Sequence, residues 1–547
     1  MIDTTGGSGG DVTITATTDG IELNASSINS GGLIDLNAAE NINIGDLVAE
    51  TGVIAVDSVG IINTGSLTTL GANITISGES LPQTVAIAGD VSTNGGDFSA
   101  NSAGDIEFST PSGLIATSDG FVELTADGAV FLPEGGIFTT GGNLIINGTS
   151  VETVAGNSTV IDTTGGSGGD VTITATTEGI GLNASSINSG GLIDLNAATN
   201  ITTGNLDTSS EVSDGGDVTL SAGESIATGS IATSSGVTGG EINLTAPSVT
   251  SGSINATGSL SSGNITVTAN RVDFTSGTNS IISQGAQLQL QSINPADDFA
   301  ISSADGVTSA AIAALGEGFS EIIIGRDDGS STLTVESAAS FSDPVTFLVP
   351  SGTIIVDAQL TGTDNAAITI TGSGATTTLN ASIITDNTPV TIDGNVIIGS
   401  EVAINTVGTD ELGAEIIIGG EINGIEPGVG NLELDAGSQT VTLGGAIGSN
   451  AALNSLEIDA ASIFLSGNTV VTVNGQDFDG FLEVTGDTSF QSNADGDENG
   501  TFNAATIQAP GHTITLSAAS IDVETINTSS PDSNGGDQIL TATYDDT

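Results

Sequence analysis

Residues 2–16 read Ile-Asp-Thr-Thr-Gly-Gly-Ser-Gly-Gly-Asp-Val-Thr-Ile-Thr-Ala, and they open a block that ends at residue 42. The block recurs at residues 161–201, 159 residues further along the chain. Only three of its 41 positions differ: Asp19 becomes Glu178, Glu22 becomes Gly181 and Glu40 becomes Thr199. A duplication of this kind predicts a repeat architecture.

A shorter period lies inside the block. A small residue, usually glycine, stands two positions before a pair of apolar residues that are separated by one residue, as Gly10 stands before Val12 and Ile14. These small residues recur every 20 to 27 residues, mostly every 22–25, as far as Ala286. The following apolar pairs include Ile34/Leu36, Ile54/Val56, Ile74/Ile76, Phe98/Ala100, Val122/Leu124 and Leu288/Leu290. A period of two predicts strands with one buried face, and the repeat length is that of a solenoid coil.

Gly, Asn, Ser and Asp between the apolar pairs suit the tight corners of such a coil, because they tolerate sharp bends. Stacked coils form parallel sheets around an aliphatic interior. Connections between parallel strands are almost always right-handed. The sequence therefore predicts an all-β fold, a right-handed parallel β-helix with about 22–25 residues per coil.

The pattern divides the chain into three parts. Residues 1–300 form a predicted β-helix that contains both copies of the block, and residues 331–547 continue as a solenoid with less regular coils. Residues 301–330 interrupt the pattern. There the segment Thr308-Ser-Ala-Ala-Ile-Ala-Ala-Leu315, followed by Gly316, predicts one short helix near 308–315, because it combines good helix formers with a glycine stop.

Composition excludes several functions. The chain has 2 Lys+Arg against 66 Asp+Glu, a formal charge of −64, so nucleic acid and anionic membrane surfaces are excluded as electrostatic partners. The acidic residues are spread along the chain, which predicts a solvated, self-repelling outer face. No stretch reaches 18 apolar residues, so no membrane insertion is expected. The lack of cysteine rules out disulfides and fits a secreted bacterial surface protein as well as a cytosolic one.

Both ends of the sequence resemble interior coils. Residues 1–20 show no signal peptide, and Met1 takes the place that Val160 holds in the second block, so we expect a segment of a longer exported protein. Near the other end, residues 535–543 (Gly-Gly-Asp-Gln-Ile-Leu-Thr-Ala-Thr) echo residues 9–17. Uncapped coils expose strand edges. Two interpretations follow: head-to-tail stacking of one chain on the next, or continuation into neighbouring parts of a larger surface protein.

The recurring Gly-Gly-Asp/Glu-Val/Ile-Thr/Asn-Ile/Leu-Thr/Ser-Ala motif at 9–16, 168–175, 215–222 and 239–246 resembles cyanobacterial filamentous-haemagglutinin-like proteins. Residues 285–291 (Gly-Ala-Gln-Leu-Gln-Leu-Gln) and 319–329 (Phe-Ser-Glu-Ile-Ile-Ile-Gly-Arg-Asp-Asp-Gly) share the resemblance. It covers residues 1–400 best, and its motifs are low in complexity. The resemblance implies an exported β-helical surface protein linked to adhesion and two-partner secretion, although the secretion domain of that family is not recognisable here.

One motif suggests a metal. Asp495-Gly-Asp497-Glu-Asn499-Gly500 matches the opening of a calcium loop, in which alternate oxygens converge on the ion. The twelfth position is Thr506 rather than Glu, so the bidentate ligand is missing. The sequence leaves a weak Ca²⁺ site at Asp495, Asp497 and Asn499 open beside a plain acidic turn. No other cofactor is expected.

Catalysis is not expected. The single His512 is predicted to lie at a surface corner, and Arg271 and Arg326 are too few to hold an acidic polysaccharide. The predicted function is an extracellular structural solenoid, forming or belonging to a cell-surface filament or sheath by head-to-tail stacking of terminal coils. The alternative is a cell-surface adhesin that binds glycans or other cells. A polysaccharide-active β-helix enzyme is the disfavoured third possibility.

Overall fold

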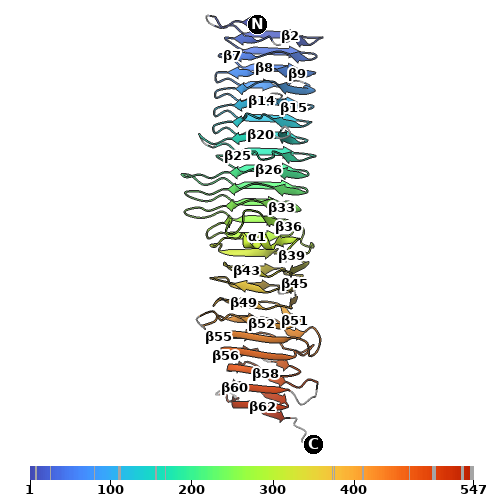
Figure 1. The fold of residues 1–547 in the computed structure, drawn as a ribbon, viewed down its shortest axis with the longest axis vertical. Helices are drawn as coiled ribbons and strands as arrows, with labels where there is room; N and C mark the ends of the chain where they lie inside the picture. The colour runs from blue at the N-terminus through green and yellow to red at the C-terminus, as the bar shows by residue number, and fades with distance from the viewer. Residues whose placement is uncertain are drawn as a thin grey trace. The chain divides into compact units, whose positions relative to one another are not determined.

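The structure is a computed structural model of residues 1–547. It describes the whole chain except residues 7–8, 25, 79, 109–112, 154–156, 167, 373, 375, 410–411, 467, 496–499, 531–534 and 543–547. Two compact units are present: unit 1 contains Met1–Ala269 and Asp273–Ala286, and unit 2 contains Asn270–Val272 and Gln287–Thr547. Each unit is a parallel β-solenoid, and together they contain about 22 turns. Figure 1 shows the stacked coils.

Each coil of unit 1 carries three strands in chain order, and we name the sheets that they build faces A, B and C. Face A contains β1 (Ile2–Asp3), β4 (Ile28–Ser30), β7 (Leu47–Ala49), β10 (Leu67–Thr69), β13 (Val91–Ser92), β16 (Leu114–Ala116), β19 (Gly136–Phe138), β22 (Val160–Asp162), β25 (Ser186–Asn188), β28 (Leu206–Asp207), β31 (Ile231–Ala232), β34 (Ile254–Asn255) and β37 (Ile281–Ile282). Face B contains β2 (Val12–Ala16), β5 (Ile34–Ala38), β8 (Ile54–Ser58), β11 (Ile74–Ile76), β14 (Phe98–Ser102), β17 (Val122–Ala126), β20 (Leu144–Gly148), β23 (Val171–Ala175), β26 (Ile193–Ala197), β29 (Val218–Ala222), β32 (Ile242–Thr245) and β35 (Ile265–Thr268). Face C contains β3 (Ile21–Glu22), β6 (Ile42–Asn43), β9 (Ile61–Thr64), β12 (Thr84–Ile87), β15 (Ile106–Phe108), β18 (Val130–Leu132), β21 (Val151–Thr153), β24 (Ile180–Gly181), β27 (Asn200–Thr202), β30 (Ser225–Ala227) and β33 (Ser248–Ser251). A further strand, β36 (Arg271–Phe274), is divided between the two units.

The predicted apolar row is confirmed on face B. Val12 pairs with Ile34, Ile34 with Ile54, and Ile54 with Ile74, all in parallel register. Ile34, Ile54 and Ile74 are fully buried. Faces A and C carry equivalent inward rows, beginning Ile2, Ile28, Leu47 on face A and Ile21, Ile42, Ile62 on face C, which the sequence analysis did not separate. The interior is therefore bounded by aliphatic side chains on three sides.

The corner between faces A and B shows why a hydroxyl residue precedes each small residue. Buried Thr117 donates its hydroxyl hydrogen to the carbonyl of Gly120 at 2.5 Å, and Thr233 donates to Gly240 at 2.7 Å. At Gly216 an added Cβ would lie 1.9 Å from the carbonyl oxygen of Gly191, one coil earlier. Glycine is required at such a corner because the backbones of successive coils touch there.

Acidic residues beside these glycines link successive coils. The Asp11 carboxylate accepts the backbone N–H of Leu33 at 3.0 Å, and Asp170 accepts that of Leu192 at the same distance. Asp217 accepts the N–H of Glu241 at 2.8 Å. Part of the negative charge therefore satisfies backbone donors of the next coil, in addition to forming the solvated face expected from the sequence.

Unit 2 repeats the three-faced coil. Its face A contains β43 (Ala339–Phe341), β46 (Leu360–Gly362), β49 (Ile383–Thr385) and β52 (Glu401–Asn405). Its face B contains β38 (Gln287–Gln291), β41 (Glu321–Gly325), β44 (Val345–Leu348), β47 (Ile368–Thr371), β50 (Val390–Ile392) and β53 (Ile416–Ile418). Its face C contains β39 (Phe299–Ser302), β40 (Gly306–Thr308), β42 (Thr332–Val335), β45 (Thr353–Val356), β48 (Thr376–Leu379), β51 (Asn395–Ile398), β54 (Ile422–Gly424), β57 (Asn468–Val471), β59 (Thr488–Gln491), β61 (Ile514–Ala518) and β63 (Gln538–Ala542).

In the last coils of unit 2, faces A and B join in single long strands. These are β55 (Asn431–Leu443), β56 (Ser455–Leu465), β58 (Gln476–Val484), β60 (Thr501–Gln508) and β62 (Ser520–Asn527). The first part of β55 pairs with β52 and its last part with β53. Register shifts between Asp435 and Thr440 mark the corner, which has become a bulge within one strand.

The predicted helix is confirmed, with shorter bounds. Helix α1 spans Ser309–Ala313, and the hydroxyl oxygen of its N-cap, Thr308, accepts the N–H of Ala311 at 3.1 Å. After the helix, the carboxylate of Asp343, which is 3% exposed, accepts the N–H groups of Gly318 and Phe319 at 2.9–3.1 Å. Among the described residues, no helix is long and apolar enough to span a membrane.

Candidate functional site

A double row of acidic side chains crosses the long strands of unit 2. The strands contain the segments Leu432-Glu-Leu-Asp435, Leu456-Glu-Ile-Asp459, Gln476-Asp-Phe-Asp479 and Ile521-Asp-Val-Glu524. In each segment the first and third residues point into the solenoid and the acidic residues point outward, because side chains alternate along a strand. We call the acidic residues of these four segments the carboxylate ladder.

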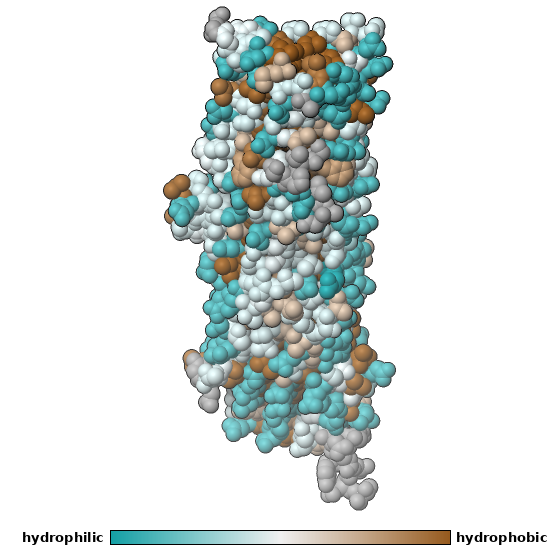
Figure 2. Space-filling model, turned by 45° about the horizontal axis from the view of Figure 1, so that its top comes forward, coloured by the Kyte–Doolittle hydropathy of each residue, from teal (hydrophilic) through white to brown (hydrophobic). Residues whose placement is uncertain are grey.

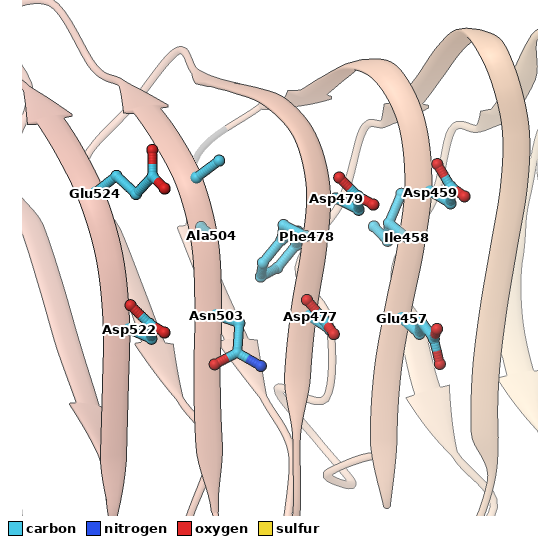
Figure 3. Close-up of a pocket in the computed structure, with 11 residues that line it drawn as sticks. Glu457, Ile458, Asp459, Asp477, Phe478, Asp479, Asn503, Ala504, Asp522 and Glu524 are labelled. Atoms are coloured by element: carbon cyan, nitrogen blue, oxygen red, sulfur yellow. The ribbon is translucent and has the colours of Figure 1, made fainter.

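Strand register turns these separate segments into a ladder. Glu433 pairs with Glu457, and Glu457 with Asp477. Asp435 likewise pairs with Asp459, and Asp459 with Asp479. Strands in a sheet lie about 4.8 Å apart, so like charges face one another across each step. Figure 3 shows the two rows, with Asn503 and Ala504 on the strand that separates Asp477 from Asp522.

The ladder surrounds shallow depressions. One of about 310 Å³ is lined by the acidic residues of the last three segments together with Ile458, Phe478, Asn503, Ala504 and Ala505. A second, of about 390 Å³, has Glu401, Glu433 and Glu457 among its lining residues. Both depressions therefore carry a concentrated negative potential and little apolar surface.

Crowding of like charges changes the acidity of the ladder. Burial raises the pKa of Glu433, and the charges of Glu457, Asp435 and Glu401 raise it further. Burial also raises the pKa of Asp459, with additional repulsion from Asp435 and Asp479. One neutral partner is present: the Asn405 amide donates to Asp435 at 3.0 Å.

The two arginines of the chain are engaged elsewhere in unit 2. Arg326 forms an ion pair with Asp328, two residues further along, at 2.7 Å, and donates to the carbonyls of Ser292 and Ile293 at 2.7 and 2.8 Å. Arg271 donates to the carbonyl of Ala304 at 3.1 Å. Because neither contact reaches the ladder, its charge is balanced chiefly by cations from solvent.

The predicted calcium loop lies mostly outside the described residues. Asp495 is described, but Asp497 and Asn499 are not, so the Ca²⁺ site stays a prediction. Across the part of the chain that the structure describes, no group of three or more His, Asp or Glu residues is arranged to hold a metal ion. The carboxylate ladder is thus a cation-attracting surface rather than a defined metal centre. His512 lies near the surface as predicted, with 37% of its side chain exposed, and its Nδ1 is 3.8 Å from Asp487.

The ladder itself was not found from the sequence. The signal was present as the repeated apolar-acid-apolar-acid segments at 432, 456, 476 and 521. Their coil spacings are unequal, since Leu456 pairs with Gln476 but Gln476 pairs with Phe502. Only the register of the strands shows that the acids coincide.

Comparison with known proteins does not identify the chain: no protein family, curated protein or solved structure matches it.

Proposed function

We propose that this protein is an extracellular structural solenoid that forms, or belongs to, a surface filament or sheath through end-to-end stacking of coils. One observation carries the proposal: side chains of the inward rows are exposed at the end coils. Ile2 is 36% exposed although its partner Ile28 is fully buried, and Leu540 is 54% exposed although its partner Leu516 is fully buried. Figure 2 shows hydrophobic surface at the amino-terminal end of unit 1.

An open coil favours a further coil. It presents unpaired backbone groups as well as apolar side chains, and both are satisfied by a strand added in register. The neighbouring coil is supplied either by a longer polypeptide or by a second copy of the chain. The formal charge of −64 opposes side-by-side contact, which supports association at the ends.

The echo between the two ends does not by itself define the contact. Val12–Ala16 is the second strand of its coil, whereas Gln538–Ala542 is the third, following β62. The similar sequences therefore occupy different faces. The strand order supports stacking in another way: the last described strand lies on face C, and the next strand in the coil order would lie on face A, where β1 lies.

Electron microscopy of the purified chain tests the proposal. The N–H of Val12 points toward the second coil, since it donates to Leu33, so the N–H of Thr13 points to the open side. Thr13→Pro removes that donor and should abolish filaments, while Thr13→Ala keeps the donor and should preserve them. A wild-type chain that stays monomeric at high concentration would contradict stacking between copies.

Export to the cell surface is part of the same proposal. It is supported by the repeated coil motif, which resembles filamentous-haemagglutinin-like proteins, and by the lack of cysteine. Immunogold labelling of intact cells should detect the protein outside. Labelling that requires permeabilised cells would contradict this location.

Adhesion is the second candidate, favoured by a stack of loops that projects from one side of unit 1 (Figure 1, green). Val212 and Leu260 on these loops are 89% and 82% exposed. Between the first two loops, Ser209, Ser210, Ser234 and Ser235 line a depression of about 430 Å³. A mixed hydroxyl and aliphatic surface suits a neutral glycan. A glycan array in which wild type binds and a Ser210→Val/Ser235→Val variant does not would support adhesion; no binding by wild type would count against it.

A further inference from the structure

A polar group is buried in an otherwise apolar row of unit 2. The row runs through Val402, Leu432, Leu456, Gln476, Phe502 and Ile521, each paired with the next in parallel register. Gln476 is fully buried. Burying an amide costs free energy unless its oxygen and nitrogen are hydrogen-bonded, so the glutamine requires an explanation.

The nitrogen of the Gln476 amide is satisfied. Nε2 donates to the carbonyl of Gln491 at 2.9 Å and to the carbonyl of Val470 at 3.1 Å, and it lies 3.4 Å from the Thr472 hydroxyl. These two carbonyls also fix the orientation of the amide. A flipped amide would place Oε1 against two acceptors, which is repulsive.

The oxygen of the same amide is not satisfied by the protein. Oε1 of Gln476 is buried, and no described protein group hydrogen-bonds to it. Oγ of Ser492, also fully buried, is in the same position. The two side chains belong to one region, because Ser492 directly follows Gln491, whose carbonyl receives the Gln476 amide.

The surroundings close this region to other groups. Phe478, Phe490 and Phe502 pack against one another with ring centroids 5.2–5.7 Å apart. Phe478 lies two residues from Gln476, Phe490 lies two residues from Ser492, and Phe502 is the strand partner of Gln476. A ligand for the two unsatisfied atoms must therefore be small, neutral and able both to donate and to accept.

We propose that a single water molecule is bound inside unit 2 between Oε1 of Gln476 and Oγ of Ser492. It donates one hydrogen bond to Oε1 and exchanges a second with the serine hydroxyl. A cation is disfavoured because both protein groups are neutral and the nearby carbonyls of Val470 and Gln491 already accept from Nε2. Bound water of this kind holds the corner between β57 and β58 in one arrangement.

The test counts long-lived internal waters in the full chain by magnetic relaxation dispersion. Ser492→Ala and Gln476→Leu should each lower the count by one relative to wild type. Leucine fits the row, and alanine is a small change that keeps the test usable if Gln476→Leu fails to fold. Ser189→Ala is the matched control: this serine is equally buried, but its hydroxyl is within hydrogen-bond distance of the carbonyls of Gly169 and Leu192, so the count should not change.

A high-resolution crystal structure of the wild-type chain provides the second readout. It should show one solvent atom within about 3.2 Å of both Oε1 and Oγ. Equal water counts in wild type and Ser492→Ala would overturn the proposal. A crystal structure in which the two side chains contact each other directly would do the same.

Discussion

Single carboxylates stabilise this fold where they meet backbone donors, and Asp343 is the most buried example described here. Replacing it with alanine leaves the N–H groups of Gly318 and Phe319 without their acceptor beside α1. Asp343→Ala should therefore lower the free energy of unfolding by about 2–3 kcal/mol, as expected for unsatisfied buried donors. Urea denaturation followed by circular dichroism measures the change.

Asp327→Ala is the control, because it removes the same charge from an exposed side chain. It should change the unfolding free energy by less than about 0.5 kcal/mol. Equal destabilisation by the two variants would mean that charge, rather than hydrogen bonding, accounts for the effect.

Not every role of an individual residue could be predicted from sequence. The acidic residues were expected to form a solvated face, and many do. Asp11 and Asp170, however, accept N–H groups from residues 22 positions away. The sequence shows an aspartate after two glycines in both blocks, but the donor belongs to the next coil. Its position depends on the register between coils, which local sequence does not specify.

At the scale of the strand, the duplicated block offers a matched pair of positions. Thr13 and Thr172 have the same local sequence, but a coil lies on both sides of Thr172, between Leu144–Gly148 and Ile193–Ala197. Thr172→Pro removes an internal ladder hydrogen bond and should lower the unfolding free energy by at least about 2 kcal/mol. Thr13→Pro should leave the Tm of the isolated chain nearly unchanged. A similar drop in Tm for both variants, measured by calorimetry, would contradict this difference.

The carboxylate ladder predicts a pH dependence that depends on strand pairing. Folding raises the pKa of Glu433 and Asp459, so the native state holds protons more tightly than the unfolded state. Their destabilising effect is absent below the unfolded pKa of about 4, grows as pH rises through the raised pKa, and is complete above it. Asp459→Asn should therefore raise the Tm at pH 7 and not at pH 3.5.

The expected gain is at most about 1 kcal/mol, because these side chains are largely solvated. Thermal unfolding of wild type and variant at both pH values measures it. Asp127→Asn, which replaces an acid of unit 1 far from the ladder in sequence, serves as the control. A gain for Asp459→Asn that persists at pH 3.5 would show that relief of charge repulsion is not the cause.

The strands show how far the sequence could lead. The period of two predicted face B, because one polar residue separates Val12 from Ile14 and the same arrangement recurs in each coil. Fusion of faces A and B in β55 was not predicted. The corner there contains Ala436, Gly437 and Ser438, which also suit a turn, and pairing with β56 on both sides of the bulge keeps it within one strand. The ladder depends on that same pairing.

For the whole molecule, the formal charge of −64 is the dominant electrostatic property. Like charges spread over stacked coils repel one another in the folded state, and the repulsion is greater there than in the more expanded unfolded chain. Dissolved salt screens charges beyond about 10 Å at 0.1 M and about 3 Å at 1 M. Stability should therefore rise with NaCl concentration, with the largest gain between 10 and 500 mM.

Calorimetry across this range at pH 7 measures the effect, and the same series at pH 4, near the sequence pI of about 4.1, is its internal control. Protonation removes most of the charge at pH 4, so the Tm should depend little on salt there. End-to-end association should follow the same order, because two coils of equal sign must approach within a few ångströms. Filaments that lengthen with salt at pH 7 would support contact between like-charged coils, whereas filaments that dissolve in salt would require an attractive charge pair at the ends, which a chain with only two arginines and lysines is poorly able to supply.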